Sequence, residues 1–140
     1  QEEPKDSAAL LQGKRVLVTE DNELNLEITE QFLEIMGIES SPARDGAEAV
    51  DMFSSSPSGT FDAILMDIQM PKMDGYEATK AIRSLPREDA ASVPIIAITA
   101  NAFREDMERA LSCGMNDHLS KPVDVKKLQE ILIKYCCGRE

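Results

Sequence analysis

Three short segments of the chain are almost entirely apolar. They cover residues 15–19, 63–66 and 95–99. Apolar runs of four or five residues are typical of strands that are buried on both faces, as in a parallel sheet. Residues 39–43 and 117–120 are more polar, and they fit strands at the edges of the same sheet. The pattern therefore predicts five strands, of which the three apolar ones are central.

Between the strands, apolar side chains return every three or four residues, which is the period of an amphipathic helix. The first helix is expected over residues 22–36, with Gly37 as its terminator. Its apolar side chains follow one another four positions apart, and we expect this row to form the apolar face: Leu24, Ile28, Phe32 and Met36.

Four further helices are expected from the same period, over residues 45–53, 74–84, 103–113 and from Asp124 onward, where the aspartate is a good N-cap. The apolar positions of these helices include Ala49, Val50 and Phe53, then Met107, Ala110 and Leu111, and last Val125, Leu128, Ile131, Leu132 and Tyr135.

Five strand–helix units of this length predict an α/β fold with a doubly wound parallel sheet and helices on both faces. In such sheets the functional site lies at the carboxyl ends of the strands, near the topological switch point. Residues 1–12 are polar and show no periodicity. We therefore expect a tether over residues 1–12 and one domain over residues 13–140.

The composition argues against several functions. The 140 residues carry 26 acidic and 15 basic side chains and a net charge of −11. Such a surface repels a phosphate backbone, so direct nucleic-acid binding is not expected. No apolar run approaches the roughly 18 to 20 residues of a membrane helix, and the polar start does not resemble a signal peptide. We expect no membrane contact by this domain, and any membrane anchor of a longer parent protein would lie outside these residues.

The three cysteines indicate a reducing compartment. Cys113, Cys136 and Cys137 are an odd number without the paired spacing of a zinc site or a disulfide framework. Reduced thiols with a structural or incidental role, in a cytoplasmic protein, are the plain interpretation.

Polar side chains follow four of the predicted strands at the point where each strand ends. They are Glu20 and Asp21 after the first strand, Asp67 after the third, Thr99 after the fourth and Lys121 after the fifth. Taken singly, an acid or a threonine there is often only a cap, and a lysine before proline is often only a surface residue. Together these residues would converge on one rim of the sheet, and the combination points to chemistry.

The three carboxylates predict a cation. Two like charges about 4 Å apart repel each other by about 4 kcal/mol at an effective dielectric constant near 20. A cluster of Glu20, Asp21 and Asp67 therefore needs a proton or a cation to relieve it. Oxygen ligands with an incomplete shell favour Mg²⁺, which keeps several of its waters.

Asp67 is also a candidate nucleophile, because carboxylates form covalent aspartyl phosphates. Attack on an anionic phosphoryl group requires positive charge at its equatorial oxygens. Mg²⁺ and the ammonium group of Lys121 can supply that charge, and Thr99 offers a hydroxyl group to the same oxygens. We hypothesise that Asp67 accepts a phosphoryl group.

The same residues lie within motifs that resemble a known family. The motifs occur in order, and the match extends over about residues 14–135. It rests on Val-Leu-Val-Thr-Glu-Asp-Asn at 16–22, Ile-Leu-Met-Asp-Ile-Gln-Met-Pro-Lys-Met-Asp-Gly at 64–75, Pro-Ile-Ile-Ala-Ile-Thr-Ala-Asn-Ala at 94–102 and Asp-His-Leu-Ser-Lys-Pro at 117–122. These motifs resemble the receiver domains of two-component response regulators, and most closely those attached to hybrid sensor histidine kinases. A fragment of such a kinase and a stand-alone phosphorelay regulator both stay open.

The resemblance implies a flavodoxin-like sheet with strand order 2-1-3-4-5 and five helices. It also implies a role for each matching residue: Asp67 as the phosphoacceptor, Lys121 as a contact of the phosphoryl group, Thr99 as the switch hydroxyl, and Glu20, Asp21, Asp67 and the carbonyl of Gln69 as the ligands of Mg²⁺. Such a domain catalyses only its own phosphorylation and dephosphorylation. Its donor would be a phosphohistidine on a histidine kinase or a histidine phosphotransfer domain, and its partner binding would change on phosphorylation.

The chain departs from the family pattern at one switch position. His118 stands where many members carry tyrosine or phenylalanine, three residues before the lysine. A rotamer switch through His118 and a partly exposed strand residue are both open interpretations. Gln69 and Asn101 occupy the positions that border the path of the hydrolytic water in this family. Homodimer formation is a further open point.

Three other functions are alternatives to this one. A flavodoxin-like cofactor binder would need a phosphate-cradling loop after the first strand, where this chain has three acids in four residues. A phosphatase resembling the haloacid dehalogenases would carry a second aspartate in place of Gln69. A receiver fold that serves only as an interaction module is the third alternative, although Asp67 and Lys121 are both present.

Overall fold

The computed structural model describes residues 11–68, 73–100, 104–121 and 123–136. Within these residues five parallel strands form one sheet in the order β2-β1-β3-β4-β5. Their bounds are Arg15–Thr19 (β1), Glu39–Ala43 (β2), Ala63–Asp67 (β3), Ile95–Thr99 (β4) and Asp117–Ser120 (β5). All five strands were predicted from the hydrophobic pattern, and the flavodoxin-like strand order is confirmed.

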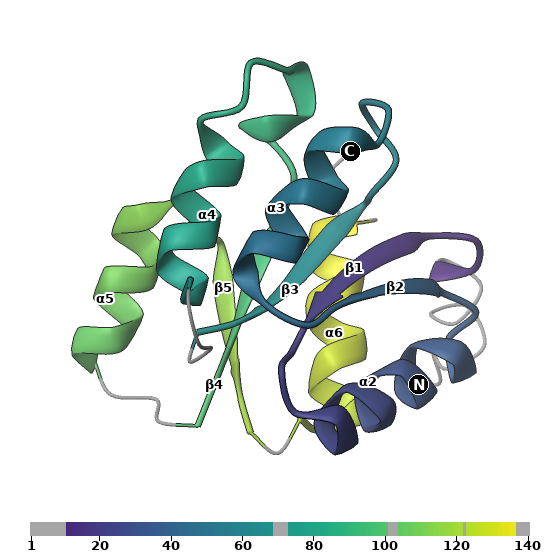
Figure 1. The fold of residues 1–140 in the computed structure, drawn as a ribbon. Coiled ribbons are helices and arrows are strands. Elements are labelled where there is room, and N and C mark those ends of the chain that lie inside the picture. Colours follow the sequence, from purple (N-terminus) through teal and green to yellow (C-terminus); the bar gives the residue numbers. More distant parts are fainter. Residues whose placement is uncertain (1–10, 69–72, 101–103, 122, 137–140) are drawn as a thin grey trace.

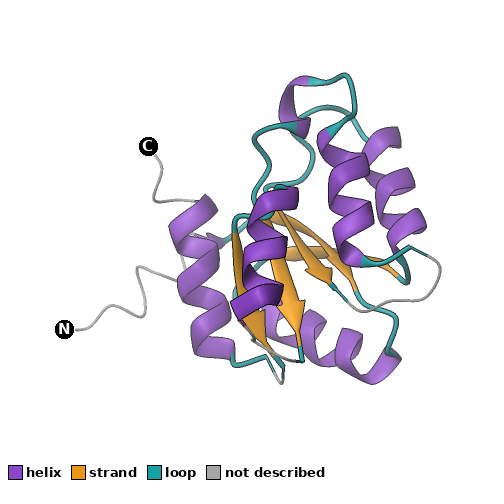
Figure 2. Ribbon diagram, turned by 90° about the vertical axis from the view of Figure 1, so that its left-hand side faces the viewer, coloured by secondary structure: helices purple, strands orange, loops and turns teal. Residues whose placement is uncertain are grey.

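Five helices alternate with the strands and cover both faces of the sheet (Figure 1). Their bounds are Glu23–Ile35 (α2), Gly46–Ser55 (α3), Gly75–Arg83 (α4), Arg104–Cys113 (α5) and Val125–Cys136 (α6), with a short 3-10 turn at Glu88–Ala90 (η1). Turning the molecule by 90° shows the sheet between the two helical layers (Figure 2). Helices α3, α4 and α5 cover one face, and α2 and α6 cover the other.

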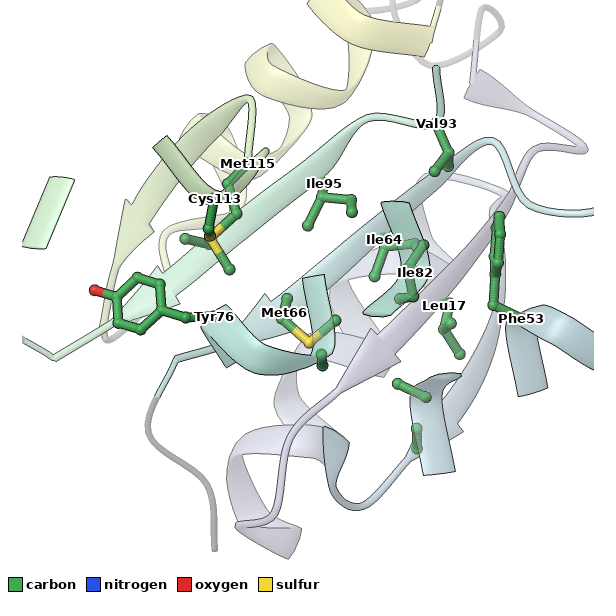
Figure 3. Packing of buried hydrophobic residues seen from close by; sticks show 14 of the residues in the cluster. Leu17, Phe53, Ile64, Met66, Tyr76, Ile82, Val93, Ile95, Cys113 and Met115 are labelled. Carbon is green, nitrogen blue, oxygen red and sulfur yellow. The ribbon is translucent and has the colours of Figure 1, made fainter. Parts of the chain in front are cut away.

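The alternation of side chains along each central strand divides the core into two clusters. Leu17, Ile64 and Met66 point to the face covered by α3, α4 and α5, where they pack with Ile82 and Tyr76 (Figure 3). Their strand neighbours point to the opposite face and pack against α2 and α6: Val16, Val18, Ala63, Leu65, Ile96 and Ile98. Since both faces of the central strands are buried, the strands read as continuous apolar runs in the sequence.

The predicted apolar face of the first helix was right at its C-terminal half, where Met36 is buried and Phe32 packs against the core, and wrong at its start. Leu24 is 64% exposed and Ile28 is 40% exposed, whereas Leu26 and Leu33 are buried against the sheet. Thr29 lies between the last two at 7% exposure. Because a polar residue stands in the middle of the buried row, the hydrophobic pattern does not reveal this row. The row of four apolar side chains that begins at Leu24 gives the stronger signal. The predicted end of the helix was right, since Gly37 has a φ of 81°.

The described part of the chain begins with a buried side chain. Leu11 is fully buried in the cluster under α2 and α6, and the Gly13 amide donates a hydrogen bond to the Gly37 carbonyl at 2.9 Å. The boundary expected between residues 12 and 13 therefore falls after the first core residue. Residues 1–10 of the predicted tether lie outside the described residues. In the described part of the chain, no helix has both the length and the hydrophobicity needed to cross a bilayer.

Candidate functional site

The acidic pair after β1 lies where the chain leaves the sheet and enters α2. Asn22 is the N-cap of α2, and its side chain accepts a hydrogen bond from the Asn25 amide at 3.0 Å. Asn22 is therefore the N-cap of α2, and the alternative that Asp21 serves only as a helix cap is wrong. Glu20 is turned inward at 4% exposure and accepts a hydrogen bond from the Asn22 amide at 3.2 Å. Asp21 is exposed at the rim.

Asp67 is the last residue of β3, and it is 1% exposed. The central strand carries it to the carboxyl edge of the sheet, next to the end of β1. One carboxylate oxygen from each of Glu20, Asp21 and Asp67 can be chosen so that all three lie within 4.8 Å of one another. The structure thus brings together three predicted site residues from two strands that are far apart in the sequence.

Lys121 completes the cluster from the end of β5, which lies two strands away from β3 in the sheet. Its Nζ donates a hydrogen bond to Oδ2 of Asp67 at 3.0 Å, and it lies 3.5 Å from Oε2 of Glu20. Burial alone would lower the pKa of Lys121. The hydrogen bond and charge of Asp67, together with the charge of Glu20, outweigh burial and raise the pKa, so the ammonium group stays charged.

Among the described residues, this one ammonium group does not balance three carboxylates. Burial, followed by the charge of Asp67, raises the pKa of Glu20 from 4.5 to about 7. Near neutral pH the cluster therefore relieves its repulsion in part by holding a proton on Glu20. A divalent cation among the same oxygens would relieve it without that proton.

Thr99 ends β4 at the same edge, and it is 2% exposed. Its backbone carbonyl accepts a hydrogen bond from the Lys121 amide at 2.8 Å. The neighbouring strands are thus tied together at the point where Thr99 and Lys121 face the rim. This backbone link was not expected from the sequence, because the pairing register that produces it becomes visible only in the sheet.

His118 lies on the edge strand β5 with its side chain 43% exposed. It pairs with Ala97 in the sheet register, two residues before the pair formed by Thr99 and Ser120. It also lines a shallow cavity of about 190 Å³ with Asp124 and Lys127. Its role as a switch stays a prediction. Gln69 and Asn101 lie outside the described residues.

A small hollow beside Lys121 was missed by the sequence analysis. It is about 50 Å³ in volume and is lined by Glu20, Asn25, Ile28, Thr29, Lys121 and Val123. The hydrophobic pattern predicts Ile28 on the apolar face of its helix, so the pattern does not indicate its place at the border of the site. The exposure of an apolar side chain next to a charged cluster is the signal that identifies this surface.

Comparison with known proteins agrees with this geometry. Residues 16–133 match the family described as the response regulator receiver domain. A relative from Dictyostelium discoideum, hybrid signal transduction histidine kinase L, is 41% identical over 138 residues. That alignment covers 96% of this chain and 8% of the kinase, so the chain spans a small part of this relative.

Two solved structures are similar over most of their length. The receiver domain of sensor histidine kinase PA1611 from Pseudomonas aeruginosa, solved with a magnesium ion in the active-site cleft, has a TM-score of 0.79 at 41% identity; the match covers 89% of this chain and 98% of that one. The receiver domain of Ssk1 from Saccharomyces cerevisiae, crystallised with the histidine phosphotransfer protein Ypd1, has a TM-score of 0.82 at 34% identity, and the match covers 92% of each chain.

Proposed function

Because the chain belongs to the response regulator receiver domain family, we propose that Asp67 is the residue that accepts the phosphoryl group. The observation that carries this proposal is the position of its carboxylate, which lies 3.0 Å from the ammonium group of Lys121 and close to the oxygens of Glu20 and Asp21. A nucleophile for a phosphoryl group needs such surroundings, because positive charge must meet the phosphoryl oxygens as they arrive.

The donor set fits Mg²⁺. The three carboxylates are oxygen ligands and they meet within reach of one ion. Burial, followed by the charge of Asp67, raises the pKa of Glu20, so the cluster holds its negative charge at a cost that a cation would reduce. We assign Glu20, Asp21 and Asp67 as the residues that would hold the ion, with the carbonyl of Gln69 as the further ligand that the family resemblance implies. The bound ion would neutralise charge on the transferring phosphoryl oxygens.

The protein's own groups account for the rest of the transfer. A carboxylate oxygen of Asp67 attacks phosphorus, forming an O–P bond as the N–P bond of the phosphohistidine breaks and the imidazole leaves with the electron pair. Lys121 already lies at the acceptor and needs little movement to follow the phosphoryl oxygens. Thr99 ends the neighbouring strand at the same edge, and we expect its hydroxyl to contact the phosphoryl oxygens of the product. The added group brings roughly −1.5 to −2 charge, which biases the surface that partners bind.

The acceptor role is tested with acetyl phosphate and Mg²⁺, followed by intact-mass measurement. We expect the parent protein to gain one phosphoryl group and an Asp67→Asn variant to gain none. Omission of Mg²⁺ should suppress the gain in the parent. If the parent gains no mass under conditions in which Mg²⁺ binds, the domain is an interaction module with a receiver fold.

We further propose that the phosphohistidine donor contacts the hollow beside Lys121. Asp67 is almost fully buried, so a donor imidazole has to approach over the side chains that border the rim. Ile28 and Val123 line that border, and Leu24 extends the apolar surface along the exposed side of α2. A histidine phosphotransfer protein or a histidine kinase is the donor class we expect, in keeping with the Ssk1 receiver, which was crystallised with such a partner.

A matched pair of variants tests this contact. Ile28→Asp should slow transfer from a phosphohistidine protein about tenfold and leave the rate with acetyl phosphate unchanged. Ile35→Asp is the control, because Ile35 is 75% exposed on the same helix but lies about two turns from Ile28. Equal rates for the two variants with the protein donor would place the donor elsewhere.

A further inference from the structure

Two buried glycines pack against the segment that follows Asp67 or against Asp67 itself. Gly46 is the first residue of α3, and Gly75 is the first residue of α4. Neither has a positive φ, so backbone freedom does not explain why glycine stands at these positions. The space around them does, because a Cβ atom at either position would collide with backbone atoms.

Gly75 lies directly against the nucleophile's own backbone. A Cβ atom on Gly75 would overlap the carbonyl oxygen of Asp67 and would lie 2.8 Å from Cα of Ile68. The Gly75 amide donates a hydrogen bond to the Ile68 carbonyl at 2.9 Å, so the chain returns to the end of β3 at the residue after Asp67. The start of α4 therefore determines where the backbone of Asp67 can lie.

Gly46 acts on the same place from the neighbouring helix. A Cβ atom on Gly46 would lie 2.6 Å from the carbonyl oxygen of Met73, 3.0 Å from Cγ of Met73 and 3.1 Å from Cβ of Ala78. The nearest of these atoms belongs to the backbone, which cannot rotate away as a side-chain tip can. Any larger residue at position 46 must therefore push Met73 and the first turn of α4 away from α3.

Two reciprocal hydrogen bonds link the residue after Met73 to the first turn of α4. Asp74 is its N-cap and accepts a hydrogen bond from the Glu77 amide at 2.9 Å. The Glu77 side chain in turn accepts one from the Asp74 amide at 3.3 Å, which completes a capping box. A continuous row of contacts therefore runs from Met73 through Asp74 to Gly75, and from Gly75 to the backbone of Asp67.

We propose that Gly46 is a positioning residue for the phosphoryl acceptor, although it lies on a different helix and touches no group of the reaction. Its missing side chain lets α3 approach Met73, and this approach sets the distance of the Asp67 carboxylate from Lys121 and Glu20. The inference rests on the proposed role of Asp67. Because a misplacement of about 1 Å can cost up to a hundredfold in rate, we expect Gly46→Ala to slow phosphorylation about tenfold and to raise the Mg²⁺ concentration for half-maximal rate.

The test compares Gly46→Ala with Gly59→Ala in the acetyl phosphate assay, with urea unfolding measured on the same samples. Gly59 has a φ of 86° and open space around it, so an alanine there strains the backbone and lowers stability without pressing on the Asp67 segment. We expect Gly59→Ala to keep the parent's rate and Mg²⁺ dependence. A Gly46→Ala protein that is less stable but phosphorylated like the parent would overturn the inference and leave only a packing role.

A second variant covers the case in which Gly46→Ala does not fold. Met73→Ala shortens the side chain that packs on Gly46 and adds no bulk, so the segment loses its support from α3 in a protein that can still pack. We expect the same rise in the Mg²⁺ requirement, and an unchanged requirement would contradict the inference. If the parent protein itself is not phosphorylated, it is the proposed function that fails, and the comparison among glycine variants does not arise.

Discussion

Arg87 and Asp89 lie near the amino ends of the strands, and Lys121, Asp67 and Glu20 lie at the carboxyl ends. In the first group the charges are matched. The Arg87 guanidinium donates to Asp89 at 2.7 and 3.1 Å and to the Phe53 carbonyl at 2.7 Å, and its carbon atom Cζ lies 4.5 Å from the centre of the Phe53 ring. In the second group one ammonium group faces several carboxylates.

The pKa values of the acids are shifted in opposite directions in the two groups. Hydrogen bonds from Arg87 lower the pKa of Asp89 from 3.8 to about 2, whereas burial and Asp67 raise the pKa of Glu20 to about 7. Similar side chains thus stabilise the fold at one end of the sheet and strain it at the other. The strained end is the one that a cation or a phosphoryl group can relieve, which is how a site can respond to a ligand.

The largest expected effect is the loss of the matched pair. Arg87→Ala leaves Asp89, whose side chain is 14% exposed, without its main donor and removes the contact with Phe53. We expect the free energy of unfolding to fall by about 2–3 kcal/mol, measured by urea denaturation. Arg15→Ala is the matched control, because Arg15 and Glu39 form an ion pair with side chains 48% and 67% exposed. Arg15→Ala should lower the free energy of unfolding by less than about 0.5 kcal/mol.

Lowering the pH should reproduce part of the loss of stability that we expect for Arg87→Ala. Since the pKa of Asp89 is lowered in the folded state, its contribution is present above pH 3.8 and is lost as the pH falls through about 2. The Arg87→Ala protein should lose this part of the acid dependence. If the two proteins lose stability in parallel between pH 4 and 2, Asp89 is not the titrating group.

The next effect concerns Mg²⁺ at the strained end. The pKa of Glu20 is raised in the folded state, so the stability that its neutral form contributes is present below pH 4.5 and is lost as the pH rises through about 7. The proton on Glu20 competes with the cation. A single competing proton with a pKa of about 7 predicts Mg²⁺ binding about tenfold tighter at pH 8 than at pH 6. Calorimetric titration measures this, and Glu20→Gln should bind weakly with little dependence on pH.

How far the sequence predicts this molecule depends on the kind of pattern involved. The three central strands were placed correctly because each is buried on both faces and therefore has a simple apolar signature. The more polar strands β2 and β5 fit the edges of the same sheet. Glu20, Asp67, Thr99 and Lys121 were placed at one rim because parallel strands end together. The inner face of α2 was predicted correctly only at Phe32 and Met36. Its first half was not, because Thr29 occupies a buried position whose polarity gives no hint of burial.

Other features depend on contacts that no local pattern contains. The Arg87 cluster joins the loop before β4 to the end of α3, and the close approach of Gly46 to Met73 joins two helices. An isolated arginine or glycine in a sequence has too many possible partners for either contact to be inferred. Such pairings become visible only once the helices are packed.

The smallest expected effect removes one charge from the strained end. Asp67→Asn takes away a repulsive partner of Glu20 and Asp21 and keeps the shape of the side chain. It also weakens the attraction to Lys121, which still faces Glu20 at 3.5 Å. Because the acids outnumber the ammonium group there, we expect the variant to be about 1 kcal/mol more stable than the parent without Mg²⁺, as measured by urea unfolding. Glu34→Gln, on the exposed side of α2, removes the same net charge and should change stability by less than about 0.5 kcal/mol.

Saturating Mg²⁺ should make the parent more stable than Asp67→Asn, because only the parent keeps all three carboxylate ligands. A variant that is less stable than the parent in both conditions would mean that Asp67 and Lys121 form a matched pair like that of Asp89 and Arg87, and the contrast between the two ends of the sheet would be lost.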